Sequence, residues 1–314
     1  MLSPSRSRRH PHAEQYASVR LASFIAGGQK RFGIVQATGL VDLTERLDVP
    51  GLRAALGHGI GRLARFGGAS SDWSPGDVTW LPPITDPVHV IGVGLNTRSH
   101  FEETAELMGR TPGDFPKYPR LFMRSPMSHI GHGEPIVVPA ESACLDYEGE
   151  IAIVIGRECH RVPARQALDY VAAYACYNDG SVRDFQAHST QVTAGKNFVA
   201  SGAFGPWLVT ADEVPDPSTL TLQTRVNGEI RQRLEPGDLI FGFGELIAYI
   251  SRIYALQPGD TILTGSPAGI GAVSQSWLRA GDKVEIDIPA VGVLSNPVVD
   301  DPRPRAMMRE NTRD

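Results

Sequence analysis

Short hydrophobic segments separated by turn residues dominate the start of the chain. Residues 18–44 contain three strand-like segments, VRLASFIA, QKRFGIVQ and LVDL, and the turn signals Gly27-Gly28 and Thr38-Gly39 separate them. Apolar residues then recur at helical spacing and predict one amphipathic helix: Leu52, Ala55, Leu56, Ile60 and Leu63. We therefore expect a disordered tail at residues 1–15, followed by a small N-terminal α+β domain at residues 16–80.

From residue 81 onward, short runs rich in β-branched residues prevail, among them VHVIGVGLN, IAIVIG, TILTG and KVEIDI. Asn227-Gly228 lies between two alternating runs and predicts a hairpin. Only three helices are expected here, at about residues 97–108, 163–173 and 243–254. Strands outnumber helices, which disfavours regular βαβ winding. The pattern predicts a β-rich α+β domain, rolled or sandwiched, at residues 81–302, with a C-terminal tail at residues 303–314.

Composition narrows the range of partners. The chain has 314 residues, of which 41% are hydrophobic and 21% are charged, as in ordinary soluble globular proteins. A formal net charge of −5 does not favour nucleic acid, and no run approaches the ~18–20 apolar residues of a membrane span. Three cysteines without CxxC spacing argue against a disulfide framework and predict a reducing, cytoplasmic location.

The segment DYEGEIAIVIG at residues 146–156 carries the first chemical signal. In a strand, residues i and i+2 point to the same face, so Glu148 and Glu150 are expected to project together. Beyond Glu150 the run is apolar on both faces, which indicates a strand that enters a core. Two carboxylates at such a place either stay in water or are held by a cation, and oxygen ligands suit Mg²⁺, Mn²⁺ or Ca²⁺.

A second polar segment, YACYNDGSVRDFQ at residues 174–186, runs from a strand into a loop. Asp179, Arg183 and Gln186 can converge there, because strand ends and loops commonly carry sites. A third carboxylate favours a metal, and Asp184 is the rival ligand to Asp179; Asp184 can instead cap the turn or pair with Arg183.

Two further candidates remain open from the residues alone. His100 and Glu103 are three apart in NTRSHFEETAE and share one helix face, which suits a water-activating base; the alternative is a solvated acidic helix. Lys196 in TAGKNF suits a point charge near substrate oxygens, and the alternative is an ordinary loop lysine.

Taken together and in this order, these segments resemble the fumarylacetoacetate hydrolase family over residues of about 88 to 299. VIGVGLNTRSHFEE is similar to the family's GLNYxxHxxE opening, and DYEGEIAIVIG resembles its metal-binding ExE strand. YNDGSVRDFQ resembles NDxSxRDxQ, and LTGSPAGIGAV resembles the TGTPxG turn. The segments LFMRSP, GHGEPIVVP, AGKNF, VNGEIRQ and AGDKVEIDIPAVGVLSNPV complete the series.

The resemblance implies a mixed β-sandwich roll, a Mg²⁺ or Mn²⁺ site with Ca²⁺ as an alternative, and a homodimer. The implied roles are metal ligands for Glu148, Glu150 and Asp179, a base pair on a lid for His100 and Glu103, a catalytic lysine for Lys196, and substrate contacts for Arg183, Gln186, Gly265 and Ser266. Thr97 stands where the family usually has Tyr, and Arg124 replaces a common Lys.

The implied activity is hydrolysis of a carbon–carbon bond in an acylpyruvate-like 2,4-dioxo acid, such as fumarylpyruvate, through an enolate. Alternatives are decarboxylation of oxaloacetate, and hydration or isomerisation of an unsaturated 2-oxo acid from aromatic catabolism. Retention of the His100–Glu103 pair favours water or proton chemistry over decarboxylation. A non-catalytic ligand-binding protein is a further alternative, which the retained ligands and base pair disfavour.

Overall fold

The structure is a computed structural model that describes residues 19–105 and 108–302. The tails expected at residues 1–15 and 303–314 lie outside the described residues.

The larger sheet consists of eleven strands within the described part of the chain. Their bounds are β1 (Arg20–Ala26), β2 (Gln29–Gln36), β3 (Gly39–Asp42), β4 (Thr79–Trp80), β5 (Val90–Gly94), β6 (Arg120–Met123), β7 (His129–Ile130), β10 (Gly149–Ile155), β11 (Val171–Asn178), β13 (Gly202–Thr210) and β16 (Thr261–Leu263). The main order is β3-β2-β1-β13-β11-β10-β16-β5-β6, while β4 pairs with β1 and β7 with β13. The N-terminal strands thus continue the large sheet through β1 and β13, which pair antiparallel. The division into domains at residues 16–80 and 81–302 stays a prediction.

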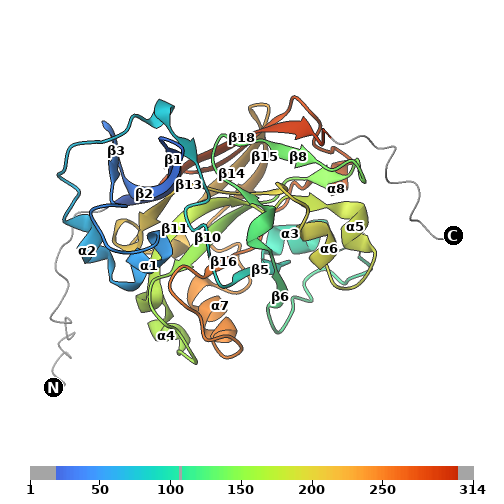
Figure 1. The fold of residues 1–314 in the computed structure, drawn as a ribbon. Coiled ribbons are helices and arrows are strands. Elements are labelled where there is room, and N and C mark those ends of the chain that lie inside the picture. Colours follow the sequence, from blue (N-terminus) through green and yellow to red (C-terminus); the bar gives the residue numbers. More distant parts are fainter. Residues whose placement is uncertain (1–18, 106–107, 303–314) are drawn as a thin grey trace, which may run out of the picture.

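A second sheet packs against the large one. It has the order β15-β14-β17-β18-β8. The bounds are β8 (Ile136–Val138), β14 (Leu222–Val226), β15 (Glu229–Leu234), β17 (Lys283–Ile288) and β18 (Gly292–Asp300). A separate ribbon pairs β9 (Leu145–Asp146) with β12 (Ser181–Val182). Strands β10, β11 and β13 of the large sheet contact β14, β17 and β18 of the second (Figure 1). The fold is therefore the β-rich α+β arrangement with packed sheets that the sequence predicts.

Successive side chains of β10 point alternately into two apolar cores, and this alternation holds the layers together. Ile151 and Ile153 face a core that lies between the two sheets, together with Ile286 of β17. Ala152 and Val154 face a different core on the other side of the large sheet. All residues of β10 are buried, as expected for a strand that enters the interior. The two apolar faces thus fix the register that presents Glu148 and Glu150 on one side.

The helices are shorter and more numerous than the sequence predicts. The α-helices are α1 (Leu52–Gly57), α2 (Ile60–Ala64), α3 (Arg98–Glu103), α4 (Ala164–Ala167), α5 (Arg183–Ala187), α6 (Thr193–Lys196), α7 (Phe243–Ile250) and α8 (Gly271–Ser274). The 3₁₀ turns are η1 (Pro75–Asp77), η2 (Pro126–Ser128), η3 (Leu168–Tyr170), η4 (Ala211–Glu213) and η5 (Pro217–Thr219). The expectation of only three helices after residue 81 was wrong, since α5, α6 and α8 are too short to produce a periodic pattern.

The single N-terminal helix expected over residues 52–63 was also wrong. It divides into α1 and α2, because Gly59 between them adopts a φ of +91°, which no α-helical residue has. The Asn227-Gly228 hairpin is confirmed: β14 and β15 pair antiparallel across these two residues, which have φ values of +54° and +81°.

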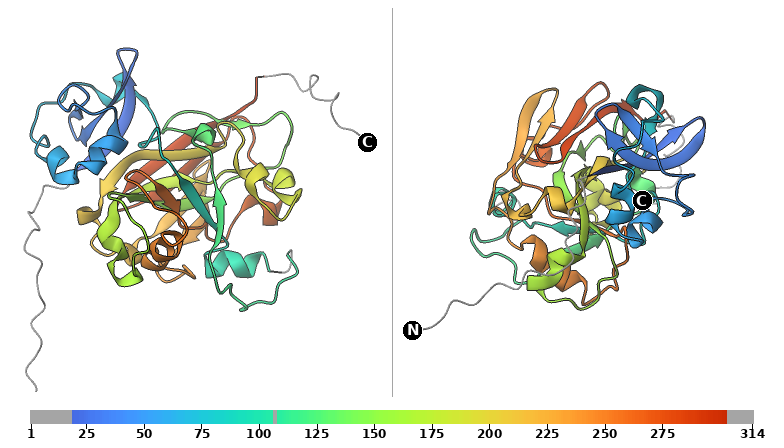
Figure 2. Two further views of the ribbon diagram at one scale, coloured as in Figure 1. Left: turned by 60° about the horizontal axis from the view of Figure 1, so that its bottom comes forward. Right: turned by 90° about the vertical axis from the view of Figure 1, so that its left-hand side faces the viewer.

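The N-terminal elements lie at one end of the molecule, and α3, α5 and α6 gather at the other (Figures 1 and 2). Within residues 19–105 and 108–302, no helix has the length and apolar character that crossing a lipid bilayer requires.

Candidate metal centre and pocket

Pairing of β10 with β11 brings three carboxylates together. Gly149 of β10 pairs with Asn178 of β11, so Glu148 and Asp179 lie side by side just beyond the ladder. The backbone N–H of Asp179 donates to the carbonyl of Glu148 at 2.7 Å. One carboxylate oxygen each of Glu148, Glu150 and Asp179 lies within 4.8 Å of the others, and all three residues are buried.

The electrostatics of this cluster fit a divalent cation. Burial, reinforced by the neighbouring carboxylates of Asp179 and Glu148, raises the pKa of Glu150 well above its ordinary value. Burial alone would also raise the pKa of Glu148, but the charges of Arg183 and Lys196 outweigh it and lower that pKa. The neighbouring cations therefore stabilise the charge of Glu148 but leave the negative charge of Glu150 uncompensated. An all-oxygen donor set with this surplus suits Mg²⁺, Mn²⁺ or Ca²⁺ better than zinc.

Two buried cations hold Asp179 from opposite sides. The ammonium of Lys196, at the end of α6, lies 2.5 Å from Glu148 Oε2 and 2.5 Å from Asp179 Oδ2. The guanidinium of Arg124 donates through Nη1 to Asp179 Oδ1 at 2.6 Å and through Nη2 to Ser201 Oγ at 2.9 Å. Arg124, noted above only as a departure from the family pattern, is thus part of the site.

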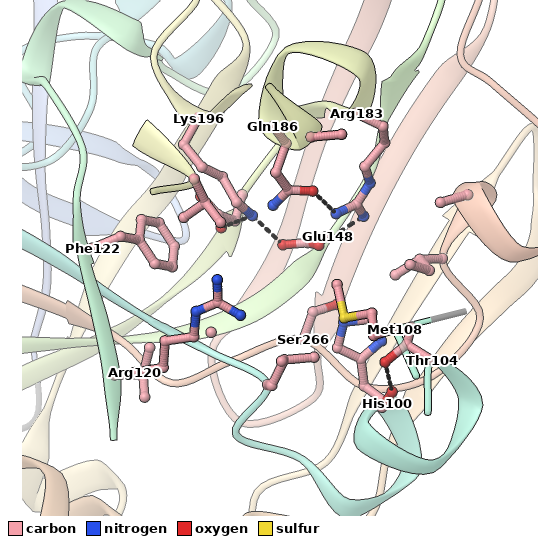
Figure 3. Close-up of a pocket in the computed structure, with 18 of the residues that line it drawn as sticks. His100, Thr104, Met108, Arg120, Phe122, Glu148, Arg183, Gln186, Lys196 and Ser266 are labelled. Atoms are coloured by element: carbon pink, nitrogen blue, oxygen red, sulfur yellow. Dashed lines mark hydrogen bonds and ion pairs between the residues drawn. The ribbon is translucent and has the colours of Figure 1, made fainter. Parts of the chain in front are cut away.

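Arg183 is engaged by carboxylates rather than left for a ligand. Its guanidinium lies 2.8 Å from Asp146 Oδ2 and 2.7 Å from Glu148 Oε1, and its Nη1 donates to Gln186 Oε1 at 3.0 Å. Both Arg183 and Gln186 still line the pocket. Figure 3 shows the amide nitrogen of Gln186 directed into the pocket, between Lys196 and Arg183. The geometry favours a positioning role for Arg183 and leaves Gln186 as the donor toward a ligand.

Asp146 is a buried member of the site that sequence reasoning missed. Its Oδ1 accepts the backbone N–H of Gly271 at 2.7 Å, and its Oδ2 accepts that of Ala272 at 3.0 Å. Together with its ion pair to Arg183, these bonds tie the start of α8 to the carboxylate cluster. The available signal was the spacing, because Asp146 stands two residues before Glu148, as Glu148 does before Glu150.

His100 and Glu103 form a pair at the edge of the pocket, as their spacing predicts. Thr97 caps α3, and its Oγ1 accepts the backbone N–H of His100 at 3.3 Å. His100 Nδ1 lies 3.4 Å from Glu103 Oε2, and Glu103 Oε1 accepts the N–H of Gly269 at 2.8 Å. His100 is buried and lines the pocket, so its Nε2 is the ring nitrogen left for a ligand or water.

The turn at residues 265–271 connects this helix to the carboxylates. The N–H of Gly265 donates to Glu150 Oε2 at 2.7 Å, so Gly265 orients a predicted metal ligand. Ser266 lines the pocket, and its Oγ accepts from Gln232 Nε2 at 2.7 Å. Thr97 Oγ1 donates to the carbonyl of Ser266 at 2.7 Å, which fixes α3 to the turn.

A pocket of about 350 Å³ opens over the cluster, a size suited to a small organic ligand (Figure 3). The three carboxylates, His100 and Lys196 line it together with apolar side chains such as Phe122 and Ile270. Of the predicted site residues, the structure places Glu148, Glu150, Asp179, His100, Lys196, Arg183, Gln186 and Ser266 in this pocket, with Glu103 and Gly265 directly behind it. Asp184 lies apart and accepts from Ser142 Oγ at 2.7 Å.

Several known proteins are similar to this chain in sequence or in structure. Oxaloacetate tautomerase YisK of Bacillus subtilis is 38% identical over 230 residues, which cover 72% of this chain and 75% of that protein. The structure of 5-carboxymethyl-2-hydroxymuconate delta-isomerase from Mycobacterium smegmatis matches with a TM-score of 0.71 at 33% identity and covers 90% of this chain and 100% of that one. Maleylpyruvate hydrolase from Sphingobium sp. SYK-6, solved with manganese(II) and pyruvate, matches with a TM-score of 0.73 at 28% identity and covers 90% and 99%.

These relatives are named as a tautomerase, an isomerase and a hydrolase, so proteins similar to this chain carry out different reactions. The model of the fumarylacetoacetate (FAA) hydrolase C-terminal region matches residues 89–299, which include every predicted site residue. The chain therefore belongs to the fumarylacetoacetate hydrolase family.

Proposed function

We propose that this protein is a divalent-metal-dependent hydrolase that cleaves a carbon–carbon bond in an acylpyruvate-like 2,4-dioxo acid. The observation that carries the proposal is the combination of three buried carboxylates with the His100–Glu103 pair around one small pocket. Glu148, Glu150 and Asp179 would hold Mg²⁺ or Mn²⁺, and the ion would supply positive charge that binds and polarises the 2-oxo acid group.

His100 has the position of the base. Its Nδ1 faces Glu103, and Glu103 is held by the N–H of Gly269, so the ring is oriented from behind. Nε2 then takes a proton from water, and the hydroxide adds to the carbonyl carbon distal to the 2-oxo acid. The bond between that carbon and its neighbour breaks, the electron pair moves onto pyruvate as an enolate, and a proton returned to carbon completes the products.

Lys196 and Gln186 are the donors for the oxyanion formed when water adds. An ammonium has three N–H donors, and Lys196 directs two of them to Glu148 and Asp179, which leaves one for substrate. Gln186 is held by Arg183 through its Oε1, so its amide nitrogen faces the pocket. One such donor is typically worth about 2.7–4 kcal/mol of transition-state stabilisation.

A second candidate is tautomerisation of oxaloacetate, which the 38% identity to a Bacillus subtilis oxaloacetate tautomerase favours. Tautomerisation also moves a proton and needs the same base, whereas simple decarboxylation of oxaloacetate needs no attacking water. The base pair therefore supports hydrolysis or tautomerisation over decarboxylation.

The test is a substrate panel with purified protein in Mg²⁺, Mn²⁺, Ca²⁺ or EDTA. Acylpyruvates, fumarylpyruvate, oxaloacetate and hydroxymuconate-type acids are compared in wild type, in His100→Ala and in the exposed-histidine control His160→Ala. We expect chelator-sensitive acylpyruvate hydrolysis that His100→Ala abolishes, while any oxaloacetate decarboxylation persists. Turnover that EDTA leaves intact would overturn the metal assignment, and equal loss of both reactions in His100→Ala would overturn the role of His100.

We also propose that the chain forms a homodimer. Met127 and Val199 are 78% and 68% exposed, and their segments adjoin, since Asn197 Oδ1 accepts the N–H of Ser125 at 2.5 Å. Exposed apolar side chains on adjoining segments are a feature of interfaces between subunits. Light scattering should give twice the mass of the chain, and Val199→Glu should reduce it; a monomeric wild type would contradict the proposal.

A further inference from the structure

Arg120 is a cation in the pocket that the proposed chemistry does not use. It begins β6, it is exposed, and it lines the same pocket as the carboxylate cluster. Figure 3 shows Arg120 and Arg183 on opposite sides of the pocket, with the guanidinium of Arg120 directed inward. Its Nη2 donates to the carbonyl of Thr190 at 3.0 Å, which steadies the side chain. A guanidinium has five N–H donors, and this is the one hydrogen bond that Arg120 makes among the described residues, so donors remain for a ligand.

A second guanidinium lies close to Arg120. Arg110 donates through Nη2 to Thr104 Oγ1 at 3.1 Å and to Met108 Sδ, and both of these residues line the pocket. The guanidinium of Arg110 stacks on Phe101 with its carbon 4.7 Å from the ring centroid, and its Nη1 is buried without a hydrogen-bond partner. Burial and the positive charge of Arg120 lower the pKa of Arg110, so the two cations oppose each other.

The arginines at the carboxylate cluster have partners. Arg124 and Arg183 are each paired with buried carboxylates at 2.6–2.8 Å. Arg110 and Arg120 form no ion pair within residues 19–105 and 108–302. Two like charges at a ligand pocket, with no counter-ion among the described residues, favour an anionic ligand there, because the ligand then supplies negative charge.

We propose that Arg120, supported by Arg110, binds a carboxylate at the distal end of the substrate, so that this protein selects 2-oxo acids with a second carboxylate. The inference rests on the proposed function, because it takes the 2-oxo acid end to lie at the carboxylate cluster. Apolar walls such as Phe122 line the pocket and suit the carbon chain between the two ends. Arg120 is then a specificity-determining residue, and the reacting bond lies between His100 and Lys196, which Figure 3 shows across the pocket from each other.

Binding of matched acids that cannot be hydrolysed tests the inference directly. The Mn²⁺-loaded protein is titrated calorimetrically with 2-oxoglutarate and 2-oxoadipate, and with 2-oxopentanoate and 2-oxohexanoate, which have the same carbon chains but end in methyl. Wild type should bind at least one dicarboxylate about tenfold more tightly than its methyl-ended counterpart.

Variants then test whether Arg120 causes the preference for dicarboxylates. Arg120→Gln should abolish the preference, and Arg120→Lys should restore part of it, because lysine returns the charge without the bidentate geometry. Arg110→Gln should weaken the preference about two- to threefold. Arg252→Gln removes an exposed arginine elsewhere and should keep the wild-type ratio. Retained affinity of Arg120→Gln for the methyl-ended acids reports that the pocket is folded.

The outcomes separate this inference from the proposed function. Equal affinity of wild type for both members of each pair, or an equal loss for both in Arg120→Gln, would overturn the role of Arg120. A dicarboxylate preference that depends on Arg120, without turnover of any 2,4-dioxo acid, would overturn the proposed hydrolysis alone. Failure of all four acids to bind in Mn²⁺ would overturn both.

Discussion

Removing the charge of Glu150 should have opposite effects with and without metal. Glu150 is buried, and its carboxylate lies within 4.8 Å of those of Glu148 and Asp179. At 4.8 Å and an effective dielectric constant near 20, one pair of like charges costs about 3.5 kcal/mol. Lys196 offsets part of this repulsion. We therefore expect Glu150→Gln to raise the free energy of unfolding of the metal-free protein by roughly 1–3 kcal/mol.

The glutamine also keeps the structure around it. Its amide oxygen can accept the N–H of Gly265 in place of Oε2, which now accepts that bond at 2.7 Å. In wild type, a divalent ion at a hundred times its dissociation constant adds about 2.7 kcal/mol of stability. For a chain of this size that corresponds to a rise in Tm of roughly 5 °C. Glu150→Gln should lose most of this rise, because it removes one of the three anionic ligands.

Differential scanning calorimetry in EDTA and in millimolar Mn²⁺ or Mg²⁺ measures both effects. The exposed-carboxylate variant Glu158→Gln is the matched control and should behave as wild type in both buffers. A lower Tm for Glu150→Gln than for wild type in EDTA would refute the repulsion argument. A full metal-induced rise in this variant would refute its assignment as a ligand.

Other positions give independent predictions. A Cβ at Gly180 would lie 1.9 Å from the carbonyl oxygen of Ser201, so Gly180→Ala should lower the free energy of unfolding, measured in urea, by roughly 1–3 kcal/mol. In the control Gly76→Ala the added Cβ meets open space, so this free energy should fall far less. Equal losses in the two variants would contradict the close packing at Gly180. Burial and a neighbouring guanidinium lower the pKa of His129 to about 3, so the unfolded chain binds its proton first and stability should fall by up to about 2 kcal/mol between pH 7 and 5. His129→Gln should show a shallower loss of unfolding free energy over that range, and an unchanged pH slope would count against it. Burial raises the pKa of the Cys176 thiol to about 12, so iodoacetamide at pH 8 should leave it unmodified in the folded protein, as peptide mass spectrometry would show.

Local sequence patterns predicted the structure where it depends on one face of a strand or on one turn. The i, i+2 spacing of Glu148 and Glu150 predicted that they point together, and β10 shows the expected alternation between two cores. The Asn227-Gly228 turn was also predictable, because few residues adopt positive φ at two successive positions. The resemblance of ordered segments predicted the family, which the match over residues 89–299 confirms.

Local sequence patterns did not predict the elements that residues distant in the sequence stabilise. Helices α5 and α6, which carry Arg183 and Lys196, have five and four residues and therefore lack a periodic apolar face. They are held by packing on each other and on β12. The break between α1 and α2 results from the positive φ of Gly59, which the spacing of the apolar residues did not predict.

The sequence by itself determined the sheet-forming segments, the hairpin turn and the acidic residues that strand spacing brings together. Only the tertiary structure decided which cations those residues meet. It joined Asp146 to Arg183, Asp179 to Arg124 and Lys196, and left Arg110 and Arg120 without carboxylate partners in the described part of the chain. The physical reason is that charges interact through space over a few ångströms, whereas these partners are separated by 17 to 55 residues along the chain.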